Sequence, residues 1–396
     1  VGGQTANNLT PKLAKSGIKL LGTSADDVDK AEDRSKFSAV LDKLHIKQPP
    51  WQAFSNFSEA KSFATKVGYP VLVRPSYVLS GAAMKVVWSQ EELSRYVGEA
   101  TTLSPDHPVV ITKFMLNSLE VDVDGVSDGK NVYIGALVEH IDAAGVHSGD
   151  AMMVIPPWRL SNKQVETITD YATRIAKSFN IKGPFNMQFL INNDQVYVIE
   201  LNIRASRSMP FVSKQIKTNL INLAAQAVLG KQLPNIPQDK WKKTPIYGIK
   251  MPQFSFMQLE GADIVLGVEM QSTGEAACFG DSFYDALSKG LISVGYNLPK
   301  TGTALITIGG AENKEKLLQT MATLKNLGFK ILATEHTAEF LEEKQIDNVQ
   351  IVHKISEPER KPNIADLLYE RKINFIINIP STSTLEKYVE IGRAHV

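Results

Sequence analysis

The chain of 396 residues contains one cysteine, Cys278. A single cysteine cannot form a disulfide within the chain, and it excludes a zinc site made of several cysteine ligands. Such sparse use of cysteine is typical of proteins in a reducing compartment. We therefore expect the protein in the cytoplasm, with the mitochondrial matrix as the alternative, and Cys278 as an ordinary packing residue.

Long apolar stretches and an excess of charge of one sign are also missing. No apolar run approaches the roughly 18 residues that a membrane-spanning helix needs, and the first residues lack the pattern of a signal peptide. The chain has 43 Lys and Arg against 42 Asp and Glu, so its net charge of +1 provides no general attraction to nucleic acid or to an anionic membrane. We expect a soluble protein without nucleic-acid or membrane partners, in which any anion-binding site is local.

The length suggests two or three domains, and a hydrophobic content of 43% is enough to build their cores. From Ser24, apolar residues recur at helical spacing as far as residue 44, which predicts one long helix. Strand and helix patterns then alternate as far as residue 201. They include a helix at 161–179 and a strand at 120–124 with one acidic and one apolar face. Four prolines between residues 233 and 252 indicate a surface connection rather than an element.

A second unit with a regular pattern begins at residue 295. Strand patterns at 304–308, 330–333, 349–353 and 375–379 alternate with helix patterns. This alternation predicts a parallel sheet with helices on both faces, in which ligands bind at the carboxyl ends of the strands. The fold class is therefore expected to be α/β.

The segment from Glu200 to Arg207 contains the most informative motif. On a strand, Glu200 and Asn202 point to the same face and offer oxygen ligands side by side. A predicted hairpin with its turn at 192–194 brings Gln188 onto the neighbouring strand. Two arginines follow the strand. Carboxylate, amide and guanidinium groups together suit a metal-bound nucleotide and an anionic second substrate, although an ordinary amphipathic strand and loop would show the same pattern.

Two loops add weaker signals. Residues 74–81 form a loop of small residues with Arg74 at its entrance, and the backbone N–H groups of such a loop can bind phosphate. A hairpin connection with an ion-paired arginine is the alternative. Glycines bracket His147 and Ser148, which predicts an exposed turn that presents an imidazole and a hydroxyl; a purely structural histidine is the alternative. The motif of Walker-type kinases does not occur.

These motifs occur in a fixed order with others. The segments are residues 2–5, 31–34, 74–81, 145–150, 183–189 and 200–207, with 210–214 just after. In this order they resemble the synthetase chain of carbamoyl phosphate, specifically its second ATP-grasp half, in the form found in eukaryotes. Residues from 295 resemble the regulatory domain that is similar to methylglyoxal synthase. Ile203 departs from the family, since many members have proline there; isoleucine is expected to loosen the turn slightly without removing a ligand.

The resemblance implies a fold in four parts. Residues 1–24 would be the remnant of a pre-ATP-grasp domain, and residues 25–294 an ATP-grasp domain of the α+β type. Residues 295–391 would be a parallel α/β domain similar to methylglyoxal synthase, truncated at its end. Residues 392–396 are similar to the translation of a sequencing adapter, and we expect them to be non-native.

The resemblance also implies roles for individual residues. Gln188, Glu200 and Asn202 would coordinate Mg²⁺ or Mn²⁺, and Arg207 would contact the reacting anion, so that Glu200, Asn202 and Arg207 form the catalytic set. The implied reaction is the ATP-dependent phosphorylation of carbamate to carbamoyl phosphate. The positions that match the ATP site of the family are Arg34 and Arg74 for the phosphates, Lys113 and Met115 for the base, Glu120 for the ribose, and Gly145, Val146, His147, Ser148, Gln188 and Glu200 for the rest of the pocket.

The family further implies partners and regulation. Carbamate is delivered by the first synthetase half, which receives nitrogen from a glutaminase or as ammonia, so these are the expected partners. The positions that match the effector site of the regulatory domain are Lys314, Thr334, Thr337, Lys354 and Asn378. His353 stands where relatives that bind N-acetylglutamate have tryptophan, which favours a nucleotide as the effector.

Two other functions stay open. Another ATP-grasp ligase, which joins a carboxylate to an amine, would share the oxygen ligands but not the two loops at 74–81 and 145–150. A catalytically inert fragment would bind the effector without turnover. The sequence also leaves open whether the parent enzyme serves arginine and urea synthesis or pyrimidine synthesis, because those determinants lie upstream.

Overall fold

The computed structural model describes residues 3–54, 57–75, 84–103, 109–255, 266–267 and 270–379. The chain divides into two compact units, Val1–Phe254 with Leu266–Val294, and Ser255–Val265 with Gly295–Val396. Most of the predicted phosphate loop, residues 76–81, and the tail at 392–396 lie outside the described residues. None of the described helices is long and apolar enough to cross a membrane.

The first unit begins with three helices, α1 (Gln4–Lys15), α2 (Ala25–Glu32) and α3 (Arg34–Lys43). The single long helix predicted from Ser24 is wrong, because Asp33 is extended (φ −81°, ψ 113°) and separates α2 from α3. The Asp33 carboxylate accepts a hydrogen bond from the Lys36 N–H at 3.0 Å and so starts a new helix, as Ser24 starts α2. The break places Arg34 in the first turn of α3, where it lines the cavity described below.

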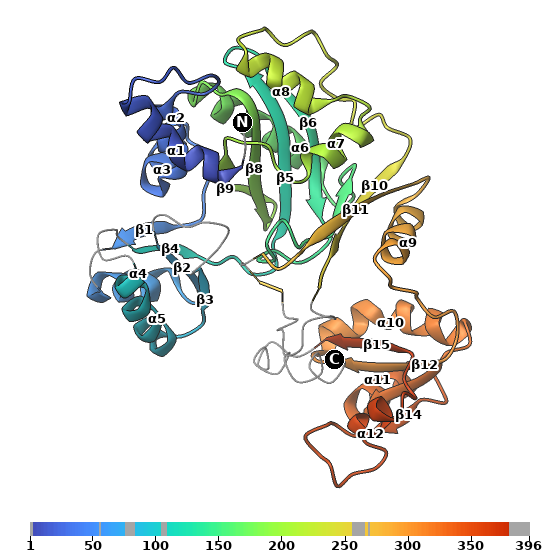
Figure 1. The fold of residues 1–396 in the computed structure, drawn as a ribbon. Coiled ribbons are helices and arrows are strands. Elements are labelled where there is room, and N and C mark those ends of the chain that lie inside the picture. The colour runs from blue at the N-terminus through green and yellow to red at the C-terminus, as the bar shows by residue number, and fades with distance from the viewer. Residues whose placement is uncertain are drawn as a thin grey trace. The chain divides into compact units, whose positions relative to one another are not determined.

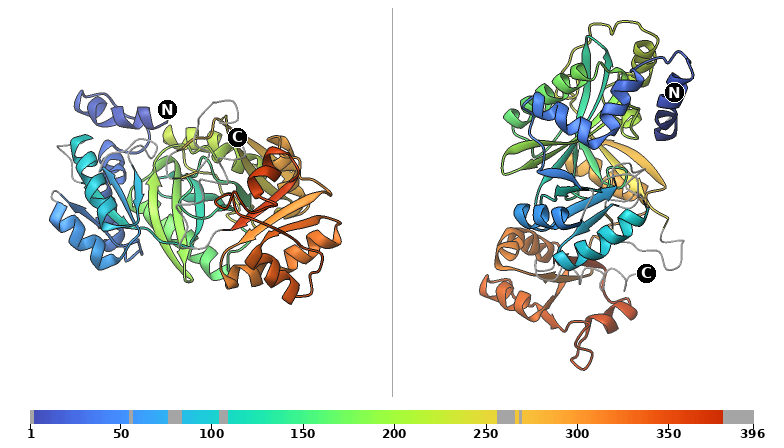
Figure 2. Two further views of the ribbon diagram at one scale, coloured as in Figure 1. Left: turned by 90° about the horizontal axis from the view of Figure 1, so that it is seen from below. Right: turned by 90° about the vertical axis from the view of Figure 1, so that its left-hand side faces the viewer.

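A small antiparallel sheet follows, with the strand order β1-β4-β2-β3. Helices α4 (Phe57–Val67) and α5 (Gln90–Leu103) lie together against it in both views of Figure 2. Alanines of α4 and Leu93 of α5 share a buried core with the valines of β2. The strands are β1 (Trp51–Phe54), β2 (Val71–Pro75), β3 (Lys85–Val87) and β4 (Val109–Lys113).

The larger sheet has seven strands in the order β11-β10-β7-β6-β5-β8-β9, and all neighbours are antiparallel. Its strands are β5 (Leu119–Asp128), β6 (Val132–His140), β7 (Met153–Ile155), β8 (Lys182–Asn192), β9 (Gln195–Asn202), β10 (Tyr247–Gln253) and β11 (Gly274–Gly280). Helices α6 (Asn162–Ser178), α7 (Met209–Gln215), α8 (Leu220–Val228) and α9 (Phe283–Ser293) accompany it (Figure 1). Most of these helices contribute to the main hydrophobic core, while α9 packs with β10 in a separate cluster.

Local sequence explains two elements that position the site. The hairpin of β8 and β9 turns through Asn193 and Asp194, both with positive φ (46° and 61°), which is the backbone that a tight two-residue hairpin requires. Helix α6 begins at a complete capping box, in which Ser161 and Gln164 bond to each other's backbone. Both features confirm the predicted hairpin and helix.

One prediction in this region is wrong. Residues 233–252 are not only a surface connection, because β10 begins at Tyr247 and pairs with both β7 and β11. Its neighbour β7 pairs only with residues 248–250, so Pro252 lies where that side of the strand has no ladder partner. A proline is tolerated at such a position.

The second unit is a parallel sheet with the order β14-β13-β12-β15, which confirms the predicted parallel α/β fold. Helices α10 (Ala311–Asn326) and α11 (Glu335–Glu343) pack with one face of the sheet, and α12 (Ile364–Tyr369) packs with the other. The strands are β12 (Thr303–Ile308), β13 (Lys330–Thr334), β14 (Gln350–Val352) and β15 (Phe375–Ile379).

Candidate active site

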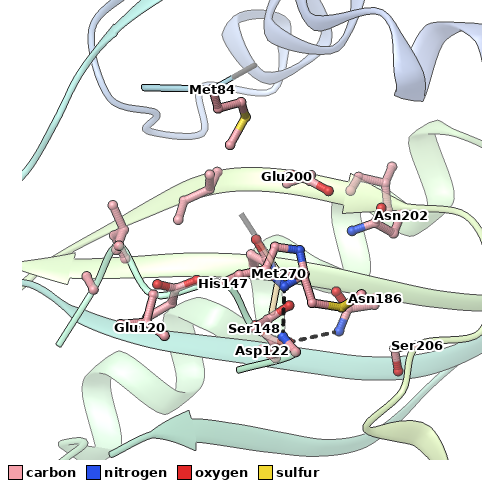
Figure 3. Close-up of a pocket in the computed structure, with 18 of the residues that line it drawn as sticks. Met84, Glu120, Asp122, His147, Ser148, Asn186, Glu200, Asn202, Ser206 and Met270 are labelled. Atoms are coloured by element: carbon pink, nitrogen blue, oxygen red, sulfur yellow. Dashed lines mark hydrogen bonds between the residues drawn. The ribbon is translucent and has the colours of Figure 1, made fainter. Parts of the chain in front are cut away.

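A cavity of about 580 Å³ lies in the first unit, between the small sheet and one face of the large sheet. Figure 3 shows Met84, which precedes β3, across the cavity from Glu120, Asp122 and Asn186 on the large sheet. Every residue predicted for the ATP, metal and catalytic sites lines this one cavity. The tertiary structure therefore brings together positions that are spread over more than 170 residues of sequence, from Arg34 to Arg207.

The predicted oxygen ligands lie on two adjacent strands. Gln188 of β8 is paired with Glu200 of β9, and Asn186 is paired with Asn202. Glu200 and Asn202 are close together on β9 in Figure 3, and the Asn202 Oδ1 accepts a hydrogen bond from Arg204 Nη2 at 3.1 Å. Carboxylate and amide oxygens in this arrangement fit a hard divalent cation. The sequence reasoning missed Asn186, which its spacing of two from Gln188 on the same strand could have indicated.

Charged groups of opposite sign meet near Glu200. Burial and, to a smaller extent, the neighbouring Arg74 together lower the pKa of Arg34 to about 9, while Glu200 opposes both effects. Burial also lowers the pKa of Arg74, again against Glu200. Arg34 donates one hydrogen bond to the carbonyl of Ile199, and its Nε has no partner among the described residues. A buried guanidinium with a spare donor is suited to a phosphate oxygen.

The turn at 145–149 requires its first glycine. Gly145 has φ +104°, and a Cβ there would lie 2.7 Å from Cζ of Phe114. The turn is tied together by His147, whose Nδ1 accepts a hydrogen bond from the Gly149 N–H at 3.0 Å. Burial lowers the pKa of His147, so the neutral ring is favoured and its proton lies on Nε2. Figure 3 shows His147 and Ser148 beside the cavity, where Nε2 can donate to a ligand.

Lys250 of β10 stabilises this turn through hydrogen bonds to its carbonyl groups. The sequence did not indicate this role. The Lys250 ammonium, on a residue only 1% exposed, donates to the carbonyls of Ser148, Gly149 and Ala151 at 2.9, 3.1 and 3.1 Å. The buried carboxylate of Asp150 holds the other side, since it accepts from the N–H groups of Gln271 and Ser272 at 2.8 Å each. A lysine in a strand carries no local signal of this role, because the carbonyls lie about 100 residues away in the sequence.

Glu120 and Asp122, on the acidic face of β5, form part of the cavity wall. Glu120, Asp122 and Asp124 are all buried, as expected for the predicted strand with one acidic face. Burial raises the pKa of Glu120 to about 7, although His140 opposes the shift. His140 Nε2 lies 3.2 Å from Asp122 Oδ1, and its Nδ1 lies 4.0 Å from Glu120 Oε2. Side-chain ligand atoms of Glu120, Asp122 and His140 lie within 4.8 Å of one another, close enough to hold a cation.

Two predicted site residues have partners at the cavity. The ammonium of Lys113 donates to the carbonyls of Gly68 and Tyr69 at 2.9 and 3.2 Å, and burial lowers its pKa. The exposed Arg207 makes one long hydrogen bond within the described residues, from Nη1 to the Ser272 hydroxyl at 3.5 Å. Its guanidinium therefore remains available to an anion.

The residues predicted to bind an effector lie in the second unit. Thr334 ends β13 and precedes α11, without a side-chain bond that caps the helix. Thr337 is buried, and its hydroxyl lies 3.5 Å from that of Thr334 and 3.3 Å from the N–H of Ile308. Asn378 of β15 accepts from Thr307 at 2.5 Å. Lys314 lies on α10, where its ammonium bonds the His336 carbonyl, and Lys354 follows β14.

Comparison with protein families agrees with this architecture. Residues 33–236 match the family described as carbamoyl-phosphate synthase L chain, ATP binding domain, and residues 316–394 match the MGS-like domain. The chain belongs to the carbamoyl-phosphate synthase family. The ATP-binding match contains β8 and β9, the two strands that carry the oxygen ligands.

Relatives of known identity are longer proteins. The Multifunctional protein URA2 of Saccharomyces cerevisiae is 43% identical over 99% of this chain, and the mitochondrial carbamoyl-phosphate synthase [ammonia] of Aquarana catesbeiana is 45% identical over 98%. The chain spans only 18% and 26% of the lengths of these two relatives. Among solved structures, a biotin carboxylase from Campylobacter jejuni aligns with a TM-score of 0.59 at 19% identity, covering 72% of this chain and 70% of its own. That likeness confirms the ATP-grasp fold.

The Lys250 ammonium provides a test of how the turn at 145–149 is held. We expect Lys250→Met to lower the free energy of unfolding by about 3 kcal/mol, because three carbonyls, two of them buried, lose their donor. Urea denaturation of the variant and the unaltered chain measures the difference. Lys289→Met is the matched control, since that lysine is exposed in an ion pair with Asp285; equal losses in the two variants would contradict the assignment.

Proposed function

We propose that the first unit phosphorylates carbamate with ATP and a divalent cation, giving carbamoyl phosphate and ADP. The observation that carries the proposal is the convergence of Gln188, Glu200 and Asn202 with Arg207 in one cavity of a chain that belongs to this family. The relatives named carbamoyl-phosphate synthase support the substrate. Because this chain spans a small part of each relative, the activity of the whole enzyme is part of the proposal.

We assign the cavity residues to the nucleotide and the metal. Arg34 and Arg74 hold the phosphates, Glu120 accepts from the ribose hydroxyls, and Lys113 with Met115 borders the base. The turn at 145–149 lines the rest of the nucleotide pocket with Gly145, Val146, His147 and Ser148. Gln188, Glu200 and Asn202 bind Mg²⁺, or Mn²⁺ in its place. The oxygen ligands on β8 and β9 support this assignment, as does the buried Nε of Arg34, which has no hydrogen-bond partner among the described residues.

The reaction needs little covalent help from the protein. A carbamate oxygen attacks the γ-phosphorus of ATP while the bond to the β-phosphate oxygen breaks, so ADP leaves and no proton need be transferred. The site residues align the reactants and offset their negative charge. Arg207 contacts the carbamate or the transferring phosphoryl group, and a bound cation neutralises the phosphate oxygens.

The proposal extends to partners. Carbamate is short-lived in water, so a source close to the cavity is needed. We propose that the first synthetase half of a longer parent chain supplies it, with nitrogen from a glutaminase or from ammonia. The length of the relatives supports a larger parent protein. The domain limits at residues 24, 294 and 391 and the cytoplasmic or mitochondrial location stay predictions.

We also propose that the second unit binds a nucleotide effector. Thr334, Thr337, Lys354 and Asn378 lie at or just beyond the ends of its parallel strands, the usual ligand side of such a sheet. Helix α11 has no side-chain capping bond at Thr334 in the described part of the chain, so its first N–H groups suit a phosphate. Lys314 and Lys354 add positive charge.

Formation of ATP from MgADP and carbamoyl phosphate by the purified chain tests the catalytic proposal. We expect Glu200→Gln to reduce the rate on the order of 100-fold or more, because a metal-binding carboxylate becomes a neutral amide. Glu166→Gln, on the exposed face of α6, is the control and should leave the rate unchanged. An inactive but folded chain that still binds the effector would favour the inert fragment, and MgADP binding without this reaction would favour another ligase.

Nucleotide affinity should depend on pH through Glu120. Its pKa of about 7 means that the carboxylate, the better acceptor for ribose hydroxyls, is lost as the pH falls through 7. We expect the Kd for MgADP, measured by calorimetry, to rise up to about tenfold from pH 8 to pH 6. The ionisation of ADP itself affects Glu120→Gln equally, so a pH profile that is no flatter in this variant would count against the role of Glu120.

The effector proposal can be tested with the same protein. With UTP as a nucleotide probe, we expect Thr334→Val to raise the Kd roughly fivefold, because one hydroxyl hydrogen bond to the ligand is lost. Thr323→Val, an exposed residue of α10, serves as the control. Calorimetric binding of N-acetylglutamate in place of UTP would contradict the preference for a nucleotide.

A further inference from the structure

Asp124 is a buried carboxylate to which none of the roles above gives a function. It lies on β5 with its side chain 0% exposed. Its Oδ1 accepts hydrogen bonds from the Ser206 hydroxyl at 2.5 Å and from Asn186 Nδ2 at 3.1 Å, and its Oδ2 accepts from the Ser208 hydroxyl at 2.6 Å. Three donors from β8 and from the segment after β9 therefore meet at one carboxylate.

The two serines stand on either side of Arg207 in the sequence. Ser208 occupies the N-cap position of α7, yet its hydroxyl makes no capping bond and is directed to Asp124 instead. Ser206 supplies the oxygen that the helix start needs, since its hydroxyl accepts from the Met209 N–H at 3.1 Å while donating to Asp124. The backbone is thus fixed immediately before and immediately after Arg207.

The side chain of Arg207 has little else to hold it. Its only hydrogen bond in the described part of the chain is the 3.5 Å contact with Ser272. Ser272 is itself fixed, because its N–H donates to Asp150 at 2.8 Å and its hydroxyl donates to the Gly149 carbonyl at 3.2 Å. The direction in which the guanidinium leaves the backbone therefore depends on residues 206 and 208.

We propose that Asp124 is a positioning residue that holds Ser206 and Ser208 as a two-point clamp, and so aims Arg207 at the anionic group that reacts with the nucleotide. The inference rests on the proposed function for the identity of that anion. It goes beyond that function because it gives a positioning role to Asp124, Ser206 and Ser208, which need not contact a substrate.

The chemistry of the clamp explains why a carboxylate is used. An ionised carboxylate only accepts hydrogen bonds, so both hydroxyls must donate to it and each has one defined direction. Hydrogen bonds to a charged acceptor are shorter and stronger than neutral ones. A neutral amide at position 124 would present donors on one side, and one of its three present donors would then have to turn away. Small errors in the position of a catalytic group can reduce a rate about 100-fold.

The test uses Ser206→Ala and Ser208→Ala, alone and together, with Ser213→Ala as the matched control. Ser213 lies in α7, and its hydroxyl donates to the Met209 carbonyl at 2.8 Å without contacting Asp124. In the formation of ATP from MgADP and carbamoyl phosphate, we expect the double variant to lose about 10- to 100-fold in kcat/KM for carbamoyl phosphate. The KM for ADP should change less than about twofold, because the nucleotide residues are untouched. Ser208→Thr, which keeps the hydroxyl, should retain most of the activity that Ser208→Ala loses.

Hydrogen exchange measured by mass spectrometry supplies a readout that does not need activity. The double variant should exchange faster in residues 203–209 but not in residues 186–191. Asp124→Asn should show the same change if it folds, and it should add little to the double serine variant, since all three act as one unit.

The possible results separate the two ideas. Failure of the unaltered chain to form ATP overturns the proposed function but not the clamp, which hydrogen exchange still decides. Unchanged exchange at 203–209 overturns the clamp. So does a rise in the KM for ADP equal to the loss for carbamoyl phosphate, or an effect no larger than that of Ser213→Ala.

Discussion

The row of buried carboxylates on β5 is the constraint on which the rest of the first unit depends. Carboxylates removed from water are costly unless hydrogen-bond donors or opposite charges meet them. Here His140 of β6 meets Asp122, Asn186 of β8 reaches Asp122 and Asp124, and two serines after β9 complete the set. Because those partners come from three separate segments, the acidic face fixes how β6, β8 and the Arg207 segment are placed around β5.

The same burial gives the cavity its electrostatic character. Removal from water raises the pKa of Glu120 and lowers those of Arg34 and Arg74. Burial therefore disfavours the charged forms of both the carboxylate and the guanidinium groups in the cavity. A ligand that carries both phosphate and a divalent cation offsets both signs together. This is the physical reason why a metal-bound nucleotide suits the cavity better than an anion or a cation alone.

The candidate sites of the two units are built in different ways. In the first unit the candidate site lies on the face of an antiparallel sheet, where residues of β5, β8 and β9 line the cavity. In the second unit the candidate effector residues lie at the carboxyl ends of parallel strands and at the start of α11. The first arrangement offers side chains on the face of a sheet, whereas the second offers loop residues and helix N–H groups.

The sequence alone determined the features that depend on neighbouring residues: the turn at Asn193 and Asp194, the facing of Glu200 and Asn202, and the alternation that makes the second unit a parallel α/β domain. The sequence did not predict strand β10, and it did not indicate which groups Asp124 and Lys250 would contact. Their partners lie roughly 60 to 100 residues away, so only tertiary packing brings donor to acceptor. Local patterns report which face a side chain takes, whereas burial and long-range pairing decide what that side chain does.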